Sequence, residues 1–138
     1  MIIFKDQFFR MNYYQQYLLH HKKEMFPPEY LCDKLIQSKN FIEQNFDQPI
    51  SLQEIVAEAY ISKYHFIRLF RNFYGTTPHQ YLKEVRVSNA KQFLKKGMPV
   101  ADACYSAGFD SVTSFTGLFK RMTGSTPYAF QQAAAKRA

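Results

Sequence analysis

Hydroxyl and basic side chains recur in this chain at a fixed spacing, and their types are those that bind phosphate. Residues 62–78 and 111–127 share one pattern: a serine, a Phe, Leu and Phe set, basic residues, a glycine and a Thr-Pro pair. Serine hydroxyls and Lys or Arg side chains hold phosphate oxygens, and arginine also pairs with guanine. A repeat of this size is one supersecondary unit used twice, so we expect two points of contact on one ligand.

The positive charge is concentrated in the half of the chain that carries this repeat. Residues 62–138 contain twelve Lys and Arg against three Asp and Glu, a net charge of +9, whereas residues 1–61 contain six against eight, a net charge of −2. Such an asymmetry is typical of a surface that meets a polyanion such as nucleic acid. The alternative is a basic face that is only solvated.

These side chains need helices to position them, and the sequence predicts helices almost throughout. Apolar residues recur every three or four positions without sustained alternation. Ser51 and Glu54 form a capping box, and Thr77 followed by Pro78 marks a second helix start. A helix of about 18 residues, roughly 27 Å long, therefore begins at Pro78 and ends before Gly97.

Two similar units flank this long helix. Residues 51–59 and 62–74 predict a short helix, a turn and a longer helix, and residues 100–107 and 111–123 predict the same arrangement, which is a helix-turn-helix. The apolar residues expected in the core are Phe66, Leu69, Phe70, Phe115, Leu118 and Phe119. The residues expected on the outward faces are Lys63, Tyr64, Ile67, Arg68 and Arg71 in the first unit, and Val112, Thr113, Thr116, Gly117, Lys120 and Arg121 in the second.

The cysteines and the N-terminal residues exclude several classes of protein. Cys32 and Cys104 lie far apart and no second pair stands at metal-ligand spacing, so we expect no metal site, no cofactor and no disulfide framework. Lys5, Asp6 and Arg10 interrupt the apolar residues of the N-terminus, which breaks any run long enough for a signal peptide or a membrane span. The sequence therefore predicts a cytoplasmic protein that does not use a membrane.

The turn and longer helix of the second unit resemble a known signature. Gly108-Phe109-Asp110-Ser111, then Phe115, Phe119-Lys120 and Gly124-Ser125-Thr126-Pro127 are similar to the C-terminal signature of the AraC/XylS family of bacterial transcription regulators. The similarity covers about residues 40–131. It implies an all-α DNA-binding domain of about seven helices, in which two helix-turn-helix subdomains joined by a long helix enter successive major grooves of double-stranded DNA.

The resemblance also implies where the domains lie. Residues 30–138 form the DNA-binding domain, with a first helix-turn-helix subdomain (30–77), a connecting helix (78–96) and a second helix-turn-helix subdomain (97–138). Residues 1–29 form an aromatic-rich N-terminal extension, in which Phe9, Tyr13 and Tyr17 predict one more amphipathic helix. This helix either packs on the chain's own core or makes a partner or dimer contact. Small-molecule sensing is absent or performed by another chain, or the sequence is a fragment.

Roles in the first unit follow from the resemblance, residue by residue. Tyr64, Ile67 and Arg68 would read bases, with Arg68 suited to bidentate pairing with guanine. Lys63 and Arg71 would bind phosphate, and the helix start at Ser62 would add backbone amides for the same purpose. The alternative for Arg68 is a core or surface role.

The second unit departs from the family at Gly117, where Arg or Lys is usual. One interpretation is a weaker contact in which valine and threonine methyl groups pack on a thymine methyl; the other is a subdomain that mainly binds phosphates. The base-reading candidates are Val112, Thr113 and Thr116, and the phosphate-binding candidates are Ser111, Lys120 and Arg121. We expect the first unit to dominate specificity.

The smaller departures from the family include Tyr60 and Gln131, of which Tyr60 matters most for geometry. Tyr60 replaces the glycine of the first turn, and a bulky residue at φ > 0 is expected to tilt the first recognition helix. Gln131 stands where the family often has Arg.

An enzyme and an interaction module are the other classes to weigh. Some relatives in the family join this domain to DNA repair through a zinc-activated cysteine, but that chemistry needs a cluster of cysteines that this sequence lacks. We therefore expect no enzymatic activity. The main alternative is a protein-interaction or co-regulatory module, with weak non-specific DNA binding and an aromatic N-terminus that recruits RNA polymerase or another regulator.

Overall fold

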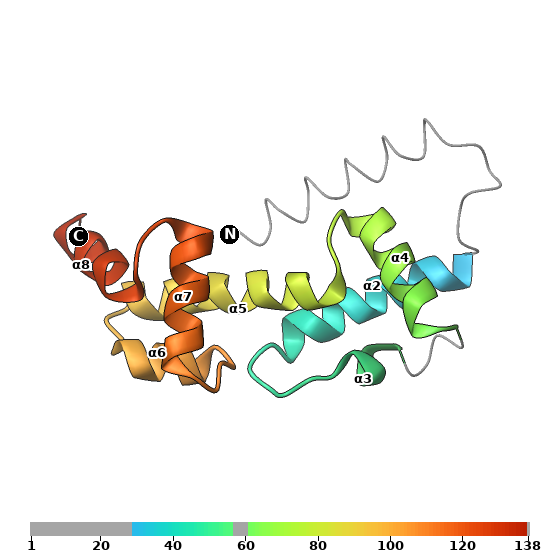
Figure 1. The fold of residues 1–138 in the computed structure, drawn as a ribbon, viewed down its shortest axis with the longest axis horizontal. Coiled ribbons are helices and arrows are strands. Elements are labelled where there is room, and N and C mark those ends of the chain that lie inside the picture. The colour runs from blue at the N-terminus through green and yellow to red at the C-terminus, as the bar shows by residue number, and fades with distance from the viewer. Residues whose placement is uncertain (1–28, 57–60, 138) are drawn as a thin grey trace. The chain divides into compact units, whose positions relative to one another are not determined.

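The computed structural model describes residues 29–56 and 61–137, and this part of the chain is built from α-helices without a strand (Figure 1). The helices are α2 (Glu29–Gln44), α3 (Leu52–Val56), α4 (Lys63–Tyr74), α5 (Pro78–Lys95), α6 (Val100–Ser106), α7 (Val112–Thr123) and α8 (Pro127–Arg137). The all-α class is confirmed, and so is the long helix that begins at Pro78. The predictions for residues 1–28 and for Tyr60 lie outside the described residues.

The described helices form two compact units. Unit 1 comprises residues 29–45 and 50–82, and unit 2 comprises residues 46–49 and 83–137. The division falls within α5, between Leu82 and Lys83. Tyr81 and Leu82 are buried, and the Tyr81 ring lies 6.2 Å from the Phe70 ring, centroid to centroid. The first turn of α5 therefore belongs to the core of unit 1.

Hydrogen bonds at the helix ends confirm the start signals. The Ser51 amide donates to Glu54 Oε2 (3.0 Å) and the Glu54 amide donates to Ser51 Oγ (3.2 Å), which is the reciprocal capping box. Thr77 Oγ1 accepts from the Gln80 amide at 3.2 Å. These caps satisfy backbone donors that a helix start leaves unpaired, so α3 and α5 begin where their sequences predict.

The core of unit 1 contains a buried lysine among aromatic rings. Lys39 is 3% exposed, and its Nζ lies 2.8 Å from Glu43 Oε1 and less than 6 Å from the ring centroids of Tyr74 and Tyr81. The Tyr81 hydroxyl donates to the same Glu43 carboxylate. A buried charge is tolerated only when it is paired, and here one carboxylate and two ring faces compensate Lys39. This lysine stabilises unit 1 and is not available to a ligand.

The core of unit 2 is built on two phenylalanines of α7. Phe115 and Phe119 are fully buried, and their rings pack on Phe109 (5.0 Å between centroids) and Phe130 (5.4 Å), respectively. The predicted core positions are confirmed for the four phenylalanines of α4 and α7, while Leu69 and Leu118 are half-buried. Each longer helix thus turns one face inward and leaves the other to solvent.

Arg86 and Gly108 hold the segment 46–49 within unit 2. Arg86 Nε donates to the Phe46 carbonyl (2.7 Å), and its Nη2 donates to the Gln48 carbonyl (2.9 Å). Gly108 has φ +94°, and an added Cβ would lie 2.4 Å from the Phe46 carbonyl oxygen. Burial lowers the pKa of the Arg86 guanidinium, whereas Asp110 and Asp47 act in the opposite direction. This arginine has a structural role.

The Gln131 side chain binds backbone carbonyl groups at and just beyond the C-terminal end of α5. Its Nε2 donates to the carbonyl oxygens of Leu94 (3.0 Å) and Met98 (2.7 Å). Carbonyl groups at a helix C-terminus have no partner within the helix. The side chain at position 131 therefore serves to satisfy backbone acceptors next to the turn before α6.

Candidate nucleic-acid interface

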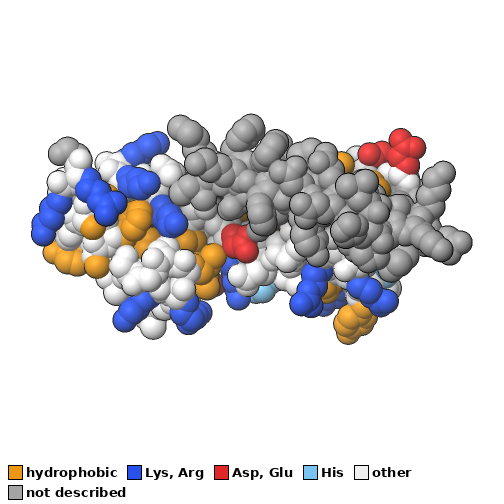
Figure 2. Space-filling view, turned by 90° about the horizontal axis from the view of Figure 1, so that it is seen from above, with side chains coloured by type: hydrophobic (Ala, Val, Ile, Leu, Met, Phe, Trp, Pro, Cys, Tyr) orange, Lys and Arg blue, Asp and Glu red, His pale blue; other side chains and the backbone are white. Residues whose placement is uncertain are grey.

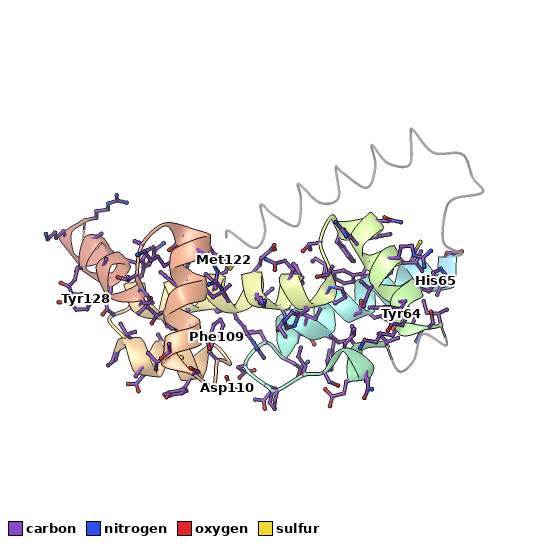
Figure 3. The ribbon with its side chains drawn as sticks, viewed as in Figure 1. Tyr64, His65, Phe109, Asp110, Met122 and Tyr128 are labelled. Atoms are coloured by element: carbon purple, nitrogen blue, oxygen red, sulfur yellow. The ribbon has the colours of Figure 1, made fainter. Side chains whose placement is uncertain are left out.

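The outward face of α4 combines an aromatic ring with two arginines. Tyr64 is 77% exposed and Arg68 and Arg71 are also exposed, whereas Phe66 and Phe70 on the opposite face are buried. At 100° per residue, Tyr64, Arg68 and Arg71 fall within an arc of about 60°. They can therefore meet one surface together. Figure 3 shows Tyr64 and His65 on the early part of α4.

The remaining candidates of α4 lie at the edges of this face. Lys63 is exposed at the first position of the helix, and Ile67 is half-buried. The Ser62 hydroxyl oxygen accepts from the His65 amide at 3.1 Å, so the hydroxyl proton remains free to donate to an anion. Sequence reasoning missed Asn72, which is exposed one helical turn after Arg68. The spacing of four residues from Arg68 was the signal that could have found it.

The outward face of α7 is smaller and carries its cations near its end. Thr113, Lys120 and Arg121 are exposed, and Thr116 is half-buried. Ser111 caps the helix, because its hydroxyl oxygen accepts from the Ser114 amide at 3.3 Å. The start of α7 is thus capped in the same way as the start of α4.

Val112 is placed less favourably for base reading than the other candidates of α7. It is half-buried and packs against the core of unit 2. The residue at the same position of α4 is Lys63, which is exposed. The first helical position therefore serves different purposes in the two units, and Thr113 is the exposed residue among the three base-reading candidates of α7.

The Arg121 side chain lies beside Gly117. An ideal Cβ at Gly117 would lie 3.6 Å from Arg121 Nη1. This is an ordinary van der Waals distance, so the guanidinium rests over the helix at the position of Gly117.

Within residues 29–56 and 61–137, the basic side chains of both faces have no acidic partner. Neither α4 nor α7 contains Asp or Glu. Among the described residues, no carboxylate pairs with Lys63, Arg68, Arg71, Lys120 or Arg121. On the face drawn in Figure 2, Lys and Arg side chains gather over the α7 and α8 part of unit 2, and the acidic side chains visible there lie elsewhere. Unpaired exposed cations of this kind attract a polyanion.

Both cysteines are partly or fully buried. Cys104 is fully buried in unit 2, and burial, together with the Asp110 carboxylate, raises the pKa of its thiol. Cys32 is half-buried on α2. Within residues 29–56 and 61–137, no three His, Cys, Asp or Glu side chains are grouped so that they could hold a metal ion. None of the helices described is long and apolar enough to cross a membrane.

Comparison with known proteins places these two faces in context. A family model described as "Helix-turn-helix domain" matches residues 55–133. The chain is 34% identical over 93 residues to the probable transcriptional regulator LumQ of Photobacterium leiognathi, covering 67% of this chain and 38% of LumQ. It is 32% identical over 93 residues to the bifunctional transcriptional activator and DNA repair enzyme AdaA of Bacillus subtilis, covering 67% of this chain and 44% of AdaA. The chain therefore spans less than half of the length of these relatives.

Solved structures share the fold. The DNA-binding domain of AdpA, a global transcriptional factor solved in complex with a target DNA, matches with a TM-score of 0.71 at 28% identity, over 75% of this chain and 95% of that one. A transcriptional regulator of Chromobacterium violaceum, described as containing an AraC-type DNA-binding domain, matches with a TM-score of 0.68 at 25% identity, over 77% of this chain and 96% of that one. The likeness thus covers both helix-turn-helix units.

Proposed function

Because this chain belongs to the AraC/XylS family of transcription regulators, we propose that it binds a specific double-stranded DNA site with α4 and α7 as recognition helices in adjacent major grooves. A cytoplasmic location is part of the proposal, since the target is chromosomal DNA. The observation that carries it is the outward face of α4, where Tyr64, Arg68 and Arg71 are exposed together without an acidic partner among the described residues.

The side chains of α4 support a division of roles. Arg68 is exposed on the outward face, about midway along α4, and its guanidinium can form two hydrogen bonds with O6 and N7 of guanine. Tyr64 and Ile67 offer apolar surface to base edges. Lys63 and Arg71, with the capped helix start at Ser62, provide cations and backbone donors for phosphates.

The side chains of α7 support a weaker contact. Thr113 and Thr116 present methyl groups that can pack on a thymine methyl, with Val112 half-buried beside them. Phosphate groups can be bound by Lys120, by Arg121 and by the backbone amides of the capped helix start at Ser111. We expect unit 1 to contribute more specificity than unit 2.

Catalysis is not part of this proposal. AdaA is named as a DNA repair enzyme as well as an activator, but the similarity covers only 44% of AdaA. The buried Cys104 thiol is unsuited to nucleophilic chemistry, because its pKa is raised and the thiolate is the reactive form. Contact with RNA polymerase and dimerisation through residues 1–29 stay predictions from the sequence.

Selection of bound duplexes from a random pool tests the proposal. The purified chain should enrich two short blocks of sequence separated by about one helical turn, roughly 10 base pairs. A single block would contradict base reading by both units. Equal retention of all sequences would contradict specific binding and favour the alternative, a co-regulatory module with weak non-specific affinity for DNA.

A further inference from the structure

The two recognition helices carry an arginine at positions that differ by one turn. With the repeat offset of 49 residues, Arg68 of α4 corresponds to Gly117 of α7, and Asn72 of α4 corresponds to Arg121 of α7. The order is thus arginine then a short residue in α4, and glycine then arginine in α7. The total number of guanidinium groups at this pair of positions is the same in both helices.

The position of the Arg121 side chain compensates for the reversed order of arginine and short residue in α7. Its Nη1 lies 3.6 Å from the point where a Cβ at residue 117 would stand. Long side chains on a helix extend toward its N-terminus and cover the preceding turn. The guanidinium of Arg121 is therefore carried back, along the outward face of α7, to the position of Gly117.

From this geometry we propose that Arg121 reads a base, with guanine as the expected partner, in the part of the DNA site bound by α7. It does so at the helix position that Arg68 occupies in α4. This inference rests on the proposed function, because it assigns a specificity residue to the second recognition helix. It changes the role of Arg121 from a general phosphate contact to a base contact.

Three features of the site support this assignment. Arg121 is exposed, and no carboxylate pairs with it in the part of the chain that the structure describes. The planar guanidinium has the fork geometry that fits guanine O6 and N7. Glycine is unfavourable inside a helix, and its presence at residue 117 is explained if a longer side chain there would displace the guanidinium.

Binding to the selected duplex and to its single-base variants tests this proposal. Arg121→Ala should remove a preference for one G·C pair in the second block, by a factor of about 5 to 150. Arg121→Lys should also lose most of it, since lysine lacks the bidentate fork. Lys120→Ala is the matched control, because Lys120 is exposed on the same helix. This variant should weaken binding to every duplex by the same factor.

A double variant provides an independent check. Gly117→Arg combined with Arg121→Asn reproduces the order found in α4, and it should regain a guanine preference that Arg121→Asn alone lacks. Arg121 is exposed and Gly117 is half-buried, and a thermal melt checks that each variant folds. A guanine preference that survives in Arg121→Asn alone would overturn the proposal.

The failure of this inference can be told apart from failure of the proposed function. Suppose that the wild-type chain selects a motif whose first block depends on Arg68, and that Arg121→Ala weakens binding to every duplex equally. Arg121 is then a phosphate contact, so this inference is wrong while the proposed function is supported. A motif without a second block overturns it as well. If the wild-type chain selects no motif, both proposals fall.

Discussion

Exposure separates the basic residues that are free to meet DNA from those that hold the protein together. Lys39 is buried beside Glu43, and Arg86 is engaged with the carbonyl groups of Phe46 and Gln48. Arg68 and Arg71 are exposed and unpaired within the described part of the chain. Net charge alone therefore overstates the surface available to a polyanion, because some cations balance internal groups.

Arg68 is the residue whose loss should change specificity most. Arg68→Ala should relax the preference at one base pair of the first block, at a cost of about 1 to 3 kcal/mol in binding free energy to the preferred duplex. The reason is that two hydrogen bonds to a guanine edge are lost and are not replaced. Fluorescence anisotropy with the selected duplex and its single-base variants measures the change.

Arg71→Ala is the matched control for Arg68→Ala, because Arg71 is an exposed arginine on the same face of α4. As a phosphate contact it should weaken binding to all duplexes alike. If both variants weaken every duplex by the same factor, the division of roles within α4 is wrong.

The free energy of unfolding of unit 2 should depend on pH because of Cys104. Its pKa is raised in the folded chain, so the unfolded thiol ionises first as the pH rises past its ordinary value of 9.0. The protonated Cys104 thiol therefore makes its full contribution to the free energy of unfolding below pH 9.0. This contribution is lost as the pH rises through the pKa of the thiol in the folded chain. Urea unfolding at several pH values should show this alkaline decline.

Cys104→Ala isolates that contribution, because alanine fits the site and does not titrate. Its free energy of unfolding should be lower than that of the wild type at neutral pH, and the difference should narrow above pH 9. A difference that stays constant across this range would show that ionisation of Cys104 does not affect folding.

At the level of helices and turns, Gly108 is the position most sensitive to an added methyl group. Gly108→Ala should reduce the free energy of unfolding by about 2 to 5 kcal/mol, since the residue has φ +94° and its Cβ would meet the Phe46 carbonyl at 2.4 Å. The turn before α7 would then shift away from the segment 46–49. Thermal or urea unfolding of the variant measures the loss.

Gly124→Ala provides the comparison, because Gly124 has a similar φ of +87° but open space around an added Cβ. It should lose only about 1 to 2 kcal/mol, the cost of a left-handed backbone for alanine. Equal losses in the two variants would mean that conformation alone, and not the close approach to Phe46, explains the glycine at position 108.

For the whole protein bound to DNA, the dependence on salt counts the phosphates that are neutralised. If the two faces neutralise about six phosphates, the logarithm of the binding constant should fall with the logarithm of salt concentration with a slope near −5. Titrations at several salt concentrations measure the slope. A slope near zero would contradict binding through the basic faces of α4 and α7.

Local features of the sequence were enough to predict the helices and the faces they present. Caps and breakers act within a few residues, so Ser51 with Glu54 and Thr77 with Pro78 marked the starts of α3 and α5 correctly. Apolar periodicity placed Phe66, Phe70, Phe115 and Phe119 in the cores, because one helical turn determines which side chains share a face.

Contacts between residues distant along the chain, and the paths of long side chains, required the folded structure. The segment 46–49 joins unit 2 through Arg86 and Gly108, which are some 40 and 60 positions away in the sequence, and such closures have no local signal. Val112 packs on a core whose shape the sequence does not specify. The Arg121 guanidinium lies at Gly117 because a flexible side chain follows the space that its neighbours leave. Helix periodicity thus predicted which face of each longer helix is exposed, while the folded structure determined which cations are unpaired among the described residues.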